Sequence, residues 1–240
     1  MPFVRGTIHE LVGTSGRIGL AILTNDRWNS TMSQLGGAIV RPDILPVEAA
    51  YSVQVADGRF ATAARVVSLR TVSDTDSTSP IGAAQTLLSA DELLHLEDAL
   101  ARFLQLPLLL GAISRHRRPV GNISSYPNWG ESYYANTPIA QQRKRFVVVS
   151  PNEWNAATPF ASGIRTTSQF KRDALQFPLI QGGLIRACCG DLATFGKNEL
   201  SLGPRSRPTP ATATLADMVA IARGLVITHA LEGALGRAGV

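Results

Sequence analysis

The sequence predicts a mainly β protein with some helix, of the α+β class, built as two halves with the same order of elements. In each half, short apolar and β-branched runs separated by Gly, Pro, Asn and Asp precede one helix with apolar residues at helical spacing. A Trp-Asn pair recurs at Trp28 and Trp154. The chain of 240 residues is long enough for two domains of ordinary size.

The first half carries five runs typical of strands: Thr7–Val12, Leu20–Thr24, Gly37–Val40, Tyr51–Val55 and Ala64–Leu69. The helix that follows is expected to begin with a capping box, in which Ser89 is the N-cap and Glu92 the third helical residue. Its apolar face comprises Leu93, Leu96, Leu100, Phe103 and Leu104. Pro107 is expected to end it, because proline has no amide hydrogen.

The second half repeats this plan. Its expected strands are Ser132–Ala135, Phe146–Ser150, Gly163–Thr166 and Leu184–Cys189. Thr214 and Asp217 fit the start of its helix. The residues predicted to form the buried face of that helix are Met218, Ile221, Ala222, Leu225 and Val226.

Local sequence also repeats between the halves. Thr24–Asn29 aligns with Ser150–Asn155, and Val40-Arg41 aligns with Ile164-Arg165 if a gap of two residues is allowed. We therefore infer a duplicated unit of about 110 residues, near the usual size of a domain. The expected division is a first domain at 1–107, a basic linker at 108–127 and a second domain at 128–240.

Charge is distributed unevenly along the chain. The net charge is +5, but residues 1–107 carry 8 basic and 11 acidic side chains, whereas residues 128–240 carry 12 basic and 7 acidic ones. The linker adds three arginines and no acid. A polyanion such as RNA is expected to bind the linker and the second half, although a basic solvated surface would produce the same pattern.

Several function classes are disfavoured by composition. Cys188 and Cys189 are adjacent, a poor arrangement for a disulfide, so they are expected to be reduced thiols. No Cys/His spacing indicates a metal site, and no cofactor is expected. The apolar run Phe103–Ile113 is too short to span a membrane, and the first residues do not form a secretion signal. A cytoplasmic protein is the default expectation.

Four short motifs, in a fixed order, carry a family resemblance. They are Arg5-Gly6-Thr7-Ile8, Trp129–Tyr134 (WGESYY), Phe146–Asn155 (FVVVSPNEWN) and Ile164–Gln169 (IRTTSQ). The sequence resembles the MazF/PemK toxins, which are endoribonucleases of bacterial toxin–antitoxin systems and share a fold with the gyrase poison CcdB.

The resemblance implies a fold and an assembly. Each half would be a small SH3-like barrel of strongly bent antiparallel sheet with a C-terminal helix. Because the family works as dimers with RNA across the interface, two tandem copies would form a pseudo-dimer within one chain, which needs no second chain. The implied partners are single-stranded RNA and an antitoxin protein that covers the RNA groove.

The resemblance also implies a metal-independent chemistry, in which the ribose 2′-hydroxyl attacks the adjacent phosphorus. The family uses an Arg from an Arg-Pro pair together with a Thr. Thr167 matches the Thr. Ungapped alignment places Lys144 on the Arg, and a shift of one residue would place Arg145 there. Nearby residues expected to contact RNA are Arg143, Arg165, Ser168, Gln169, Lys171 and Arg172.

The first half departs further from the family pattern. Ile18-Gly19 replaces Arg-Pro, and the gapped alignment places Asp43 where Thr is expected, so this copy is expected to be inactive. Two other functions stay open. One is a catalytically inactive module that binds RNA or a protein. The other, less favoured, is a CcdB-like gyrase inhibitor, whose C-terminal Trp-Gly-Ile has no match in Gly236–Val240.

Overall fold

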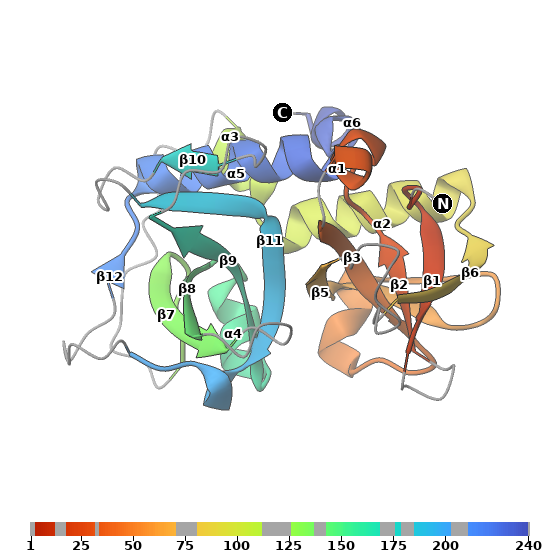
Figure 1. Ribbon diagram of the computed structural model, residues 1–240, viewed down its shortest axis with the longest axis horizontal. Helices are drawn as coiled ribbons and strands as arrows, with labels where there is room; N and C mark the ends of the chain where they lie inside the picture. Colours follow the sequence, from red (N-terminus) through yellow and green to blue (C-terminus); the bar gives the residue numbers. More distant parts are fainter. Residues whose placement is uncertain are drawn as a thin grey trace.

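The computed structural model describes residues 3–12, 18–31, 34–70, 81–111, 126–136, 143–168, 176–178, 185–202 and 211–239. It contains two antiparallel six-stranded sheets, one from each half, that lie side by side (Figure 1). The fold is therefore a mixture of sheet and helix, with strands in the majority, as the sequence predicts.

The first sheet has the strand order β4-β5-β3-β2-β1-β6. Its strands are β1 (Thr7–Leu11), β2 (Gly19–Ile22), β3 (Gln34–Arg41), β4 (Ser52–Gln54), β5 (Phe60–Arg70) and β6 (Ile81–Leu87). The second sheet has the order β10-β11-β9-β8-β7-β12. Its strands are β7 (Glu131–Asn136), β8 (Arg143–Val148), β9 (Phe160–Thr167), β10 (Gln176–Pro178), β11 (Arg186–Gly196) and β12 (Ala211–Thr212).

Each strand of one sheet thus has a counterpart at the same place in the other. Within the described residues neither sheet closes, because β4 and β6 lie at opposite edges of the first sheet and β10 and β12 at opposite edges of the second. The small closed barrels expected from the family resemblance are therefore open sheets. The strands that precede the long helices, β6 and β12, were not predicted from the sequence.

The turn after the second strand is built from the same hydrogen bonds in both halves. The Thr24 hydroxyl donates to Asn29 Oδ1 (2.5 Å), and the Asn29 amide donates to the Thr24 carbonyl (3.0 Å). The Ser150 hydroxyl and the Asn155 amide make the same two bonds, at 2.6 and 3.2 Å. The motif that recurs in the sequence is therefore a buried side-chain clamp on a strand end.

The register of the central strands also repeats, and it corrects the sequence alignment. Ile22 pairs with Gly37, and Val148 pairs with Gly163, so both members of the second pair lie 126 positions after those of the first. The gap of two residues inferred from the sequence is therefore wrong. Without it, Arg41 rather than Asp43 is the counterpart of Thr167.

The α-helices follow the same order in each half, whereas the 3-10 helices differ: η1 lies between β3 and β4, and η3 follows β11. The first half has α1 (Asp26–Thr31), the 3-10 helix η1 (Pro46–Tyr51), α2 (Ala90–Phe103) and α3 (Leu106–Leu110). The second half has α4 (Asn152–Ala157), the 3-10 helix η3 (Lys197–Glu199), α5 (Leu215–His229) and α6 (Glu232–Arg237). The two predicted capping boxes, Ser89 with Glu92 and Thr214 with Asp217, are confirmed.

Proline does not end α2, contrary to prediction. The helix stops at Phe103 and is followed by Gln105 with φ of 55°, a left-handed backbone that breaks the helical hydrogen bonds. Pro107 instead lies in the first turn of α3, where a missing amide hydrogen costs little. Ala230, with φ of 50°, separates α5 from α6 in the same way.

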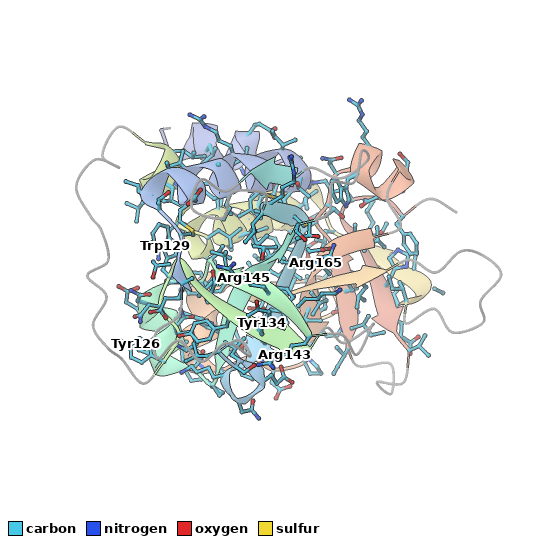
Figure 2. All side chains as sticks on the ribbon, turned by 60° about the vertical axis from the view of Figure 1, so that its left-hand side comes forward. Tyr126, Trp129, Tyr134, Arg143, Arg145 and Arg165 are labelled. Atoms are coloured by element: carbon cyan, nitrogen blue, oxygen red, sulfur yellow. The ribbon has the colours of Figure 1, made fainter. Side chains whose placement is uncertain are left out.

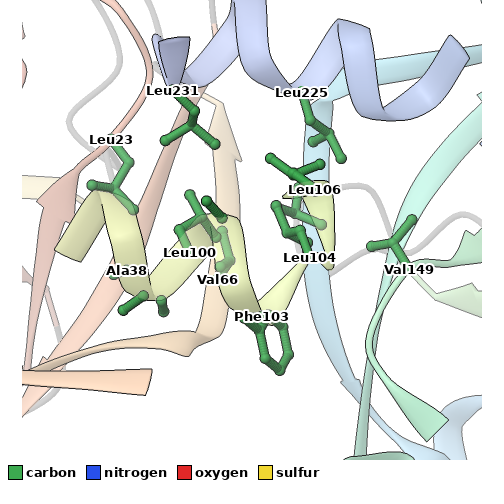
Figure 3. Packing of buried hydrophobic residues seen from close by; sticks show 14 of the residues in the cluster. Leu23, Ala38, Val66, Leu100, Phe103, Leu104, Leu106, Val149, Leu225 and Leu231 are labelled. Atoms are coloured by element: carbon green, nitrogen blue, oxygen red, sulfur yellow. The ribbon is translucent and has the colours of Figure 1, made fainter. Parts of the chain in front are cut away.

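The short terminal helix of each half packs on the long helix of the other half. α3 contacts α5, and α6 contacts α2, so two pairs of helices connect the halves across the junction of the sheets. A continuous apolar core follows from this exchange, and Figure 3 shows Leu104 and Leu106 lying beside Leu225 and Val149. All four side chains are buried. The predicted apolar faces of α2 and α5 are buried as well, apart from the partly exposed Leu93.

Aromatic side chains and strand contacts complete the junction. Trp154 of the second half packs edge-on against Phe103 and Tyr51 of the first, with ring centroids 5.5 and 6.2 Å away. Trp28 of the first half lies against Gly190 of the second. The strands β5 and β11 run side by side in Figure 1, where the Ser68 hydroxyl donates to the Gly190 carbonyl (2.9 Å).

Gly190 is the position where the junction has the least space. A Cβ added there would lie 2.0 Å from Trp28 Cζ2, so we expect Gly190→Ala to lower the free energy of unfolding by about 2 kcal/mol or more. Gly236→Ala on α6 is the matched control, because a Cβ added at that glycine would meet no atom within 4 Å. Denaturant unfolding of both variants measures the effect, and equal stabilities would contradict this packing.

His229, the last residue of α5, is fully buried against Gly36 of the first half. Among the described residues neither ring nitrogen has a hydrogen-bond partner. Burial, with the positive charge of Arg5 as a smaller cause, lowers the pKa of His229 to about 3 from 6.5. The ring is therefore neutral in the folded protein at every pH above about 3.

This buried histidine predicts a loss of stability in acid. Below pH 6.5 this histidine binds a proton in the unfolded chain, whereas in the folded chain it stays neutral down to about pH 3. The contribution of the neutral ring to the free energy of unfolding is therefore fully present above pH 6.5 and is lost as the pH falls toward 3. We expect His229→Phe to remove this contribution to the dependence of the free energy of unfolding on pH, which amounts to at most about 1.4 kcal/mol per pH unit. The measurement is denaturant unfolding at a series of pH values from about 4 to about 7, and parallel curves for the two proteins would show that the assignment is wrong.

Candidate functional site

Lys144 and Thr167 lie on one face of the second sheet. Arg145 pairs with Thr166 across β8 and β9, and both strands continue one residue further, so Lys144 stands beside Thr167. Successive side chains alternate between faces, and paired residues share a face. Both side chains are half-buried, and within the described part of the chain the Lys144 ammonium has no hydrogen-bond or ion-pair partner.

Arg145 lies on the opposite face of the sheet from Thr167. It shares its face with Thr166, whose hydroxyl donates to the Arg145 carbonyl (3.3 Å), and its own guanidinium donates to the Ser132 hydroxyl (3.2 Å). The register therefore does not bring Arg145 beside Thr167, as a shift of one residue would have done. Of the two basic residues considered for the Arg position, Lys144 is the one that lies beside Thr167.

Arg165 shares the face of Thr167, but its charge is compensated. Its guanidinium forms an ion pair with Asp191, and both side chains are largely buried. A second contact, at 4.0 Å, joins it to the Cys188 sulfur. The Asp191 carboxylate therefore already compensates the charge of Arg165, which the sequence predicts to contact RNA.

Arg143 lies at the start of β8, over the ring of Tyr134 (Figure 2), with its guanidinium carbon 5.4 Å from the ring centroid. It also donates to the Ser201 hydroxyl (2.6 Å) and the Leu202 carbonyl (3.0 Å). Ser168 is exposed directly after β9. The other expected RNA ligands, Gln169, Lys171 and Arg172, lie outside the described residues, as does the arginine cluster of the linker.

Arg186 was not singled out from the sequence. This residue begins β11 and is the Cα partner of Thr167 on the side away from Lys144. Its side chain is half-buried. The sequence did predict a strand around it, but nothing in a strand pattern says which residue of β9 it faces, because a bulge between Ala187 and Leu192 sets that register.

The corresponding place in the first half is occupied by an ion network. Arg41, the counterpart of Thr167, pairs with Glu48, whose carboxylate is fully buried and also accepts from Arg65 Nε (2.7 Å). The Arg65 guanidinium stacks 3.3 Å above the Phe160 ring of the second half. Arg41 and Arg65 therefore share one counter-charge, and Arg41, rather than a hydroxyl, stands at this place.

Two other motif residues have structural roles. Arg5, from the Arg-Gly motif, donates to Glu97 (2.8 Å) and to the Leu23 carbonyl, and its amide donates to Asp26 (2.6 Å). Tyr133 donates its hydroxyl to Glu131 (2.7 Å), and burial, followed by that bond and the Glu131 charge, raises the pKa of Tyr133 above its usual range. The Tyr133 hydroxyl therefore keeps its proton at neutral pH.

The described residues offer neither a metal site nor a membrane span. No three His, Cys, Asp or Glu side chains among them are grouped to hold a metal ion. None of the helices described has the length and apolar character needed to cross a bilayer.

No family model and no curated protein matches the sequence. Many solved structures match part of the chain, among them the following three. An endoribonuclease in complex with its cognate antitoxin, from Mycobacterial species, is 22% identical over 46% of this chain and 95% of its own, with a TM-score of 0.35. Another mycobacterial endoribonuclease is 21% identical over 48% and 96%, also at 0.35. MazF from Deinococcus radiodurans is 22% identical over 43% and 96%, at 0.34.

The buried carboxylate of Glu48 is expected to be important for stability. Glu48→Gln leaves Arg41 and Arg65 without their shared counter-charge, so we expect the free energy of unfolding to fall by about 2–3 kcal/mol. Glu153→Gln, at an exposed position on α4, is the control. If both variants unfold at the same denaturant concentration, the network does not hold the first half together.

Proposed function

We propose that the chain is a toxin-like, metal-independent endoribonuclease of the MazF/PemK type that cleaves single-stranded RNA at its second half. The observation that carries the proposal is the pair formed by Lys144 and Thr167 on a half-exposed face, at the two positions that match the family's Arg and Thr. The first half has no equivalent pair, because Ile18 and Arg41 stand there.

The proposal includes two tandem copies of one unit that together form an intrachain pseudo-dimer. The repeated strand order, the repeated Thr24 and Ser150 clamps and the reciprocal helix packing support common descent of the copies. The domains would be 1–107 and 128–240, with 108–127 as the linker. The first copy would serve as a scaffold, and the protein would act in the cytoplasm, with an antitoxin protein as its regulator.

The reaction would be an internal transesterification. The ribose 2′-oxygen forms a bond to the adjacent phosphorus while the bond from phosphorus to the 5′-oxygen breaks, which leaves a 2′,3′-cyclic phosphate and a 5′-hydroxyl. The 2′-hydroxyl proton passes to water, and the departing 5′-oxygen takes a proton from water. Lys144 would stabilise the charge that builds on the phosphate oxygens, and the Thr167 hydroxyl would donate to one of them.

The two proposed catalytic residues can be tested by substitution. We expect Thr167→Ala and Lys144→Ala each to lower the rate of cleavage of a long single-stranded RNA by about 100-fold, because each removes one donor to the transition state. Lys144→Arg is expected to keep activity, since a guanidinium makes a two-pronged phosphate contact. Thr212→Ala, at an exposed edge-strand position, is the control.

The assay is carried out with purified full-length protein and excess chelator, and it identifies the fragment ends. Fragments with 5′-hydroxyl ends that disappear in Thr167→Ala support the proposal. Cleavage that persists unchanged in both alanine variants would rule out this site.

A second function is a binding module that holds RNA or a protein partner without cutting. The replacement of Arg-Pro by Lys144-Arg145, with Arg145 on the other face, favours it. RNA that is retained intact by the wild-type chain, at a site weakened by Lys144→Ala, would support the module over the enzyme.

A further inference from the structure

We propose that Arg186 is a second phosphate-binding cation of this site and supplies the guanidinium that the Arg-Pro position no longer provides. This inference rests on the proposed function for the identity of the ligand, a phosphodiester of single-stranded RNA. It adds a residue that lies far from the matching motifs in the sequence and reaches the site only through strand pairing.

The order of the strands places Lys144, Thr167 and Arg186 in one row across the sheet. β8, β9 and β11 are consecutive in the sheet, Arg186 is the Cα partner of Thr167, and the register of β8 places Lys144 on the other side of Thr167. Neighbouring strands are about 4.8 Å apart, so the two cations flank the hydroxyl with their Cα atoms about 10 Å from each other. That span matches a phosphate held between two long side chains.

The row lies on one face of the sheet and is half-exposed. Ala187 and Thr166, the next pair along β11 and β9, face the opposite way into the core, where Ala187 is fully buried. The alternation therefore directs Arg186 and Thr167 away from the core. Both side chains, like that of Lys144, are partly open to solvent.

Other arginines of the second half are placed less well for this role. Arg165 is paired with Asp191, and Arg145 bonds Ser132 on the far face. Arg143 precedes Lys144 at the start of β8, so its side chain lies on the face of Arg145, and it donates to Ser201 and Leu202. Among the arginines of the described β8, β9 and β11, Arg186 alone adjoins Thr167 in the register.

The chemistry gives Arg186 a distinct task. An ammonium is a point charge, whereas a planar guanidinium can donate two parallel hydrogen bonds to the two non-bridging oxygens of a phosphate. Lys144 and Arg186 would therefore be complementary, and Thr167 between them would fix the phosphorus. In the first half Phe60 is the partner of Arg41, so the arrangement of cation, hydroxyl and cation is specific to the second half.

The experiment compares Arg186→Ala and Arg186→Lys with the wild-type chain, using a long single-stranded RNA for cleavage and a short fluorescent one, with a 2′-deoxy sugar at each position, for binding. Arg223→Ala is the matched control, because it removes the same charge from an exposed position on α5. Thermal unfolding of each variant checks the fold.

We expect Arg186→Ala to lower kcat/KM by about 100-fold and to reduce the slope of log affinity against log salt by about 0.7, the value for one lost phosphate contact on a single strand. Arg186→Lys is expected to have the wild-type slope of log affinity against log salt, but a kcat between those of the wild-type chain and Arg186→Ala. Arg223→Ala is expected to leave kcat unchanged.

The outcomes separate this inference from the proposed function. If the wild-type chain cleaves RNA and Arg186→Ala behaves like Arg223→Ala, the role of Arg186 is overturned while the enzyme stands. If the wild-type chain binds without cleaving and Arg186→Ala still loses the slope, the enzyme fails and the phosphate site stands. A folded wild-type chain that neither binds nor cleaves overturns both.

Discussion

The exchange of terminal helices across the junction is the contact on which the rest of the molecule depends. α3 of the first half covers α5 of the second, and α6 of the second covers α2 of the first. The side chains between them, such as Phe103, Leu104, Leu106 and Leu231, are almost fully buried. Because burial of one such side chain contributes about 2 kcal/mol, separation of the halves would expose far more apolar surface than a small domain can tolerate.

This junction explains how two similar halves can differ chemically. The helices and the tryptophan contacts determine the packing, and they leave the outer face of each sheet free to change. In the first half, Arg41 of that face pairs with the buried carboxylate of Glu48 on η1, which Arg65 shares. In the second half the same row carries Lys144, Thr167 and Arg186. One half thus supplies rigidity and the other a half-exposed basic row, which agrees with the uneven charge along the sequence.

Local sequence patterns predicted those features, such as helix caps and buried helix faces, that depend only on residues close together in the chain. The capping boxes at Ser89 and Thr214 and the buried faces of the two long helices follow from spacing within one turn or two, and they are present. Pro107 was misjudged because the left-handed residue at Gln105, rather than proline, ends α2. Of the edge strands, β4 was predicted, whereas β6, β10 and β12 were not; a strand as short as Ala211–Thr212 forms only through pairing with a distant partner.

The candidate site was less accessible to sequence reasoning, for a physical reason. A shift of one residue in strand register exchanges the two faces, so the choice between Lys144 and Arg145 could not be made before β8 and β9 were paired. Arg186 required the pairing of β11 as well, together with its bulge. The sequence therefore shows which residue types are present, but the face of the sheet on which each side chain lies depends on the strand register.

The central claim is that one face of the second sheet holds the phosphate of RNA. The most direct measurement is a crystal structure of the chain with a short single-stranded RNA that carries a 2′-deoxy sugar at the position of attack, which prevents cleavage. The account predicts a phosphate against the Thr167 hydroxyl, between the Lys144 and Arg186 side chains. A phosphate on the face of Arg145, or RNA bound only to the first half, would contradict it.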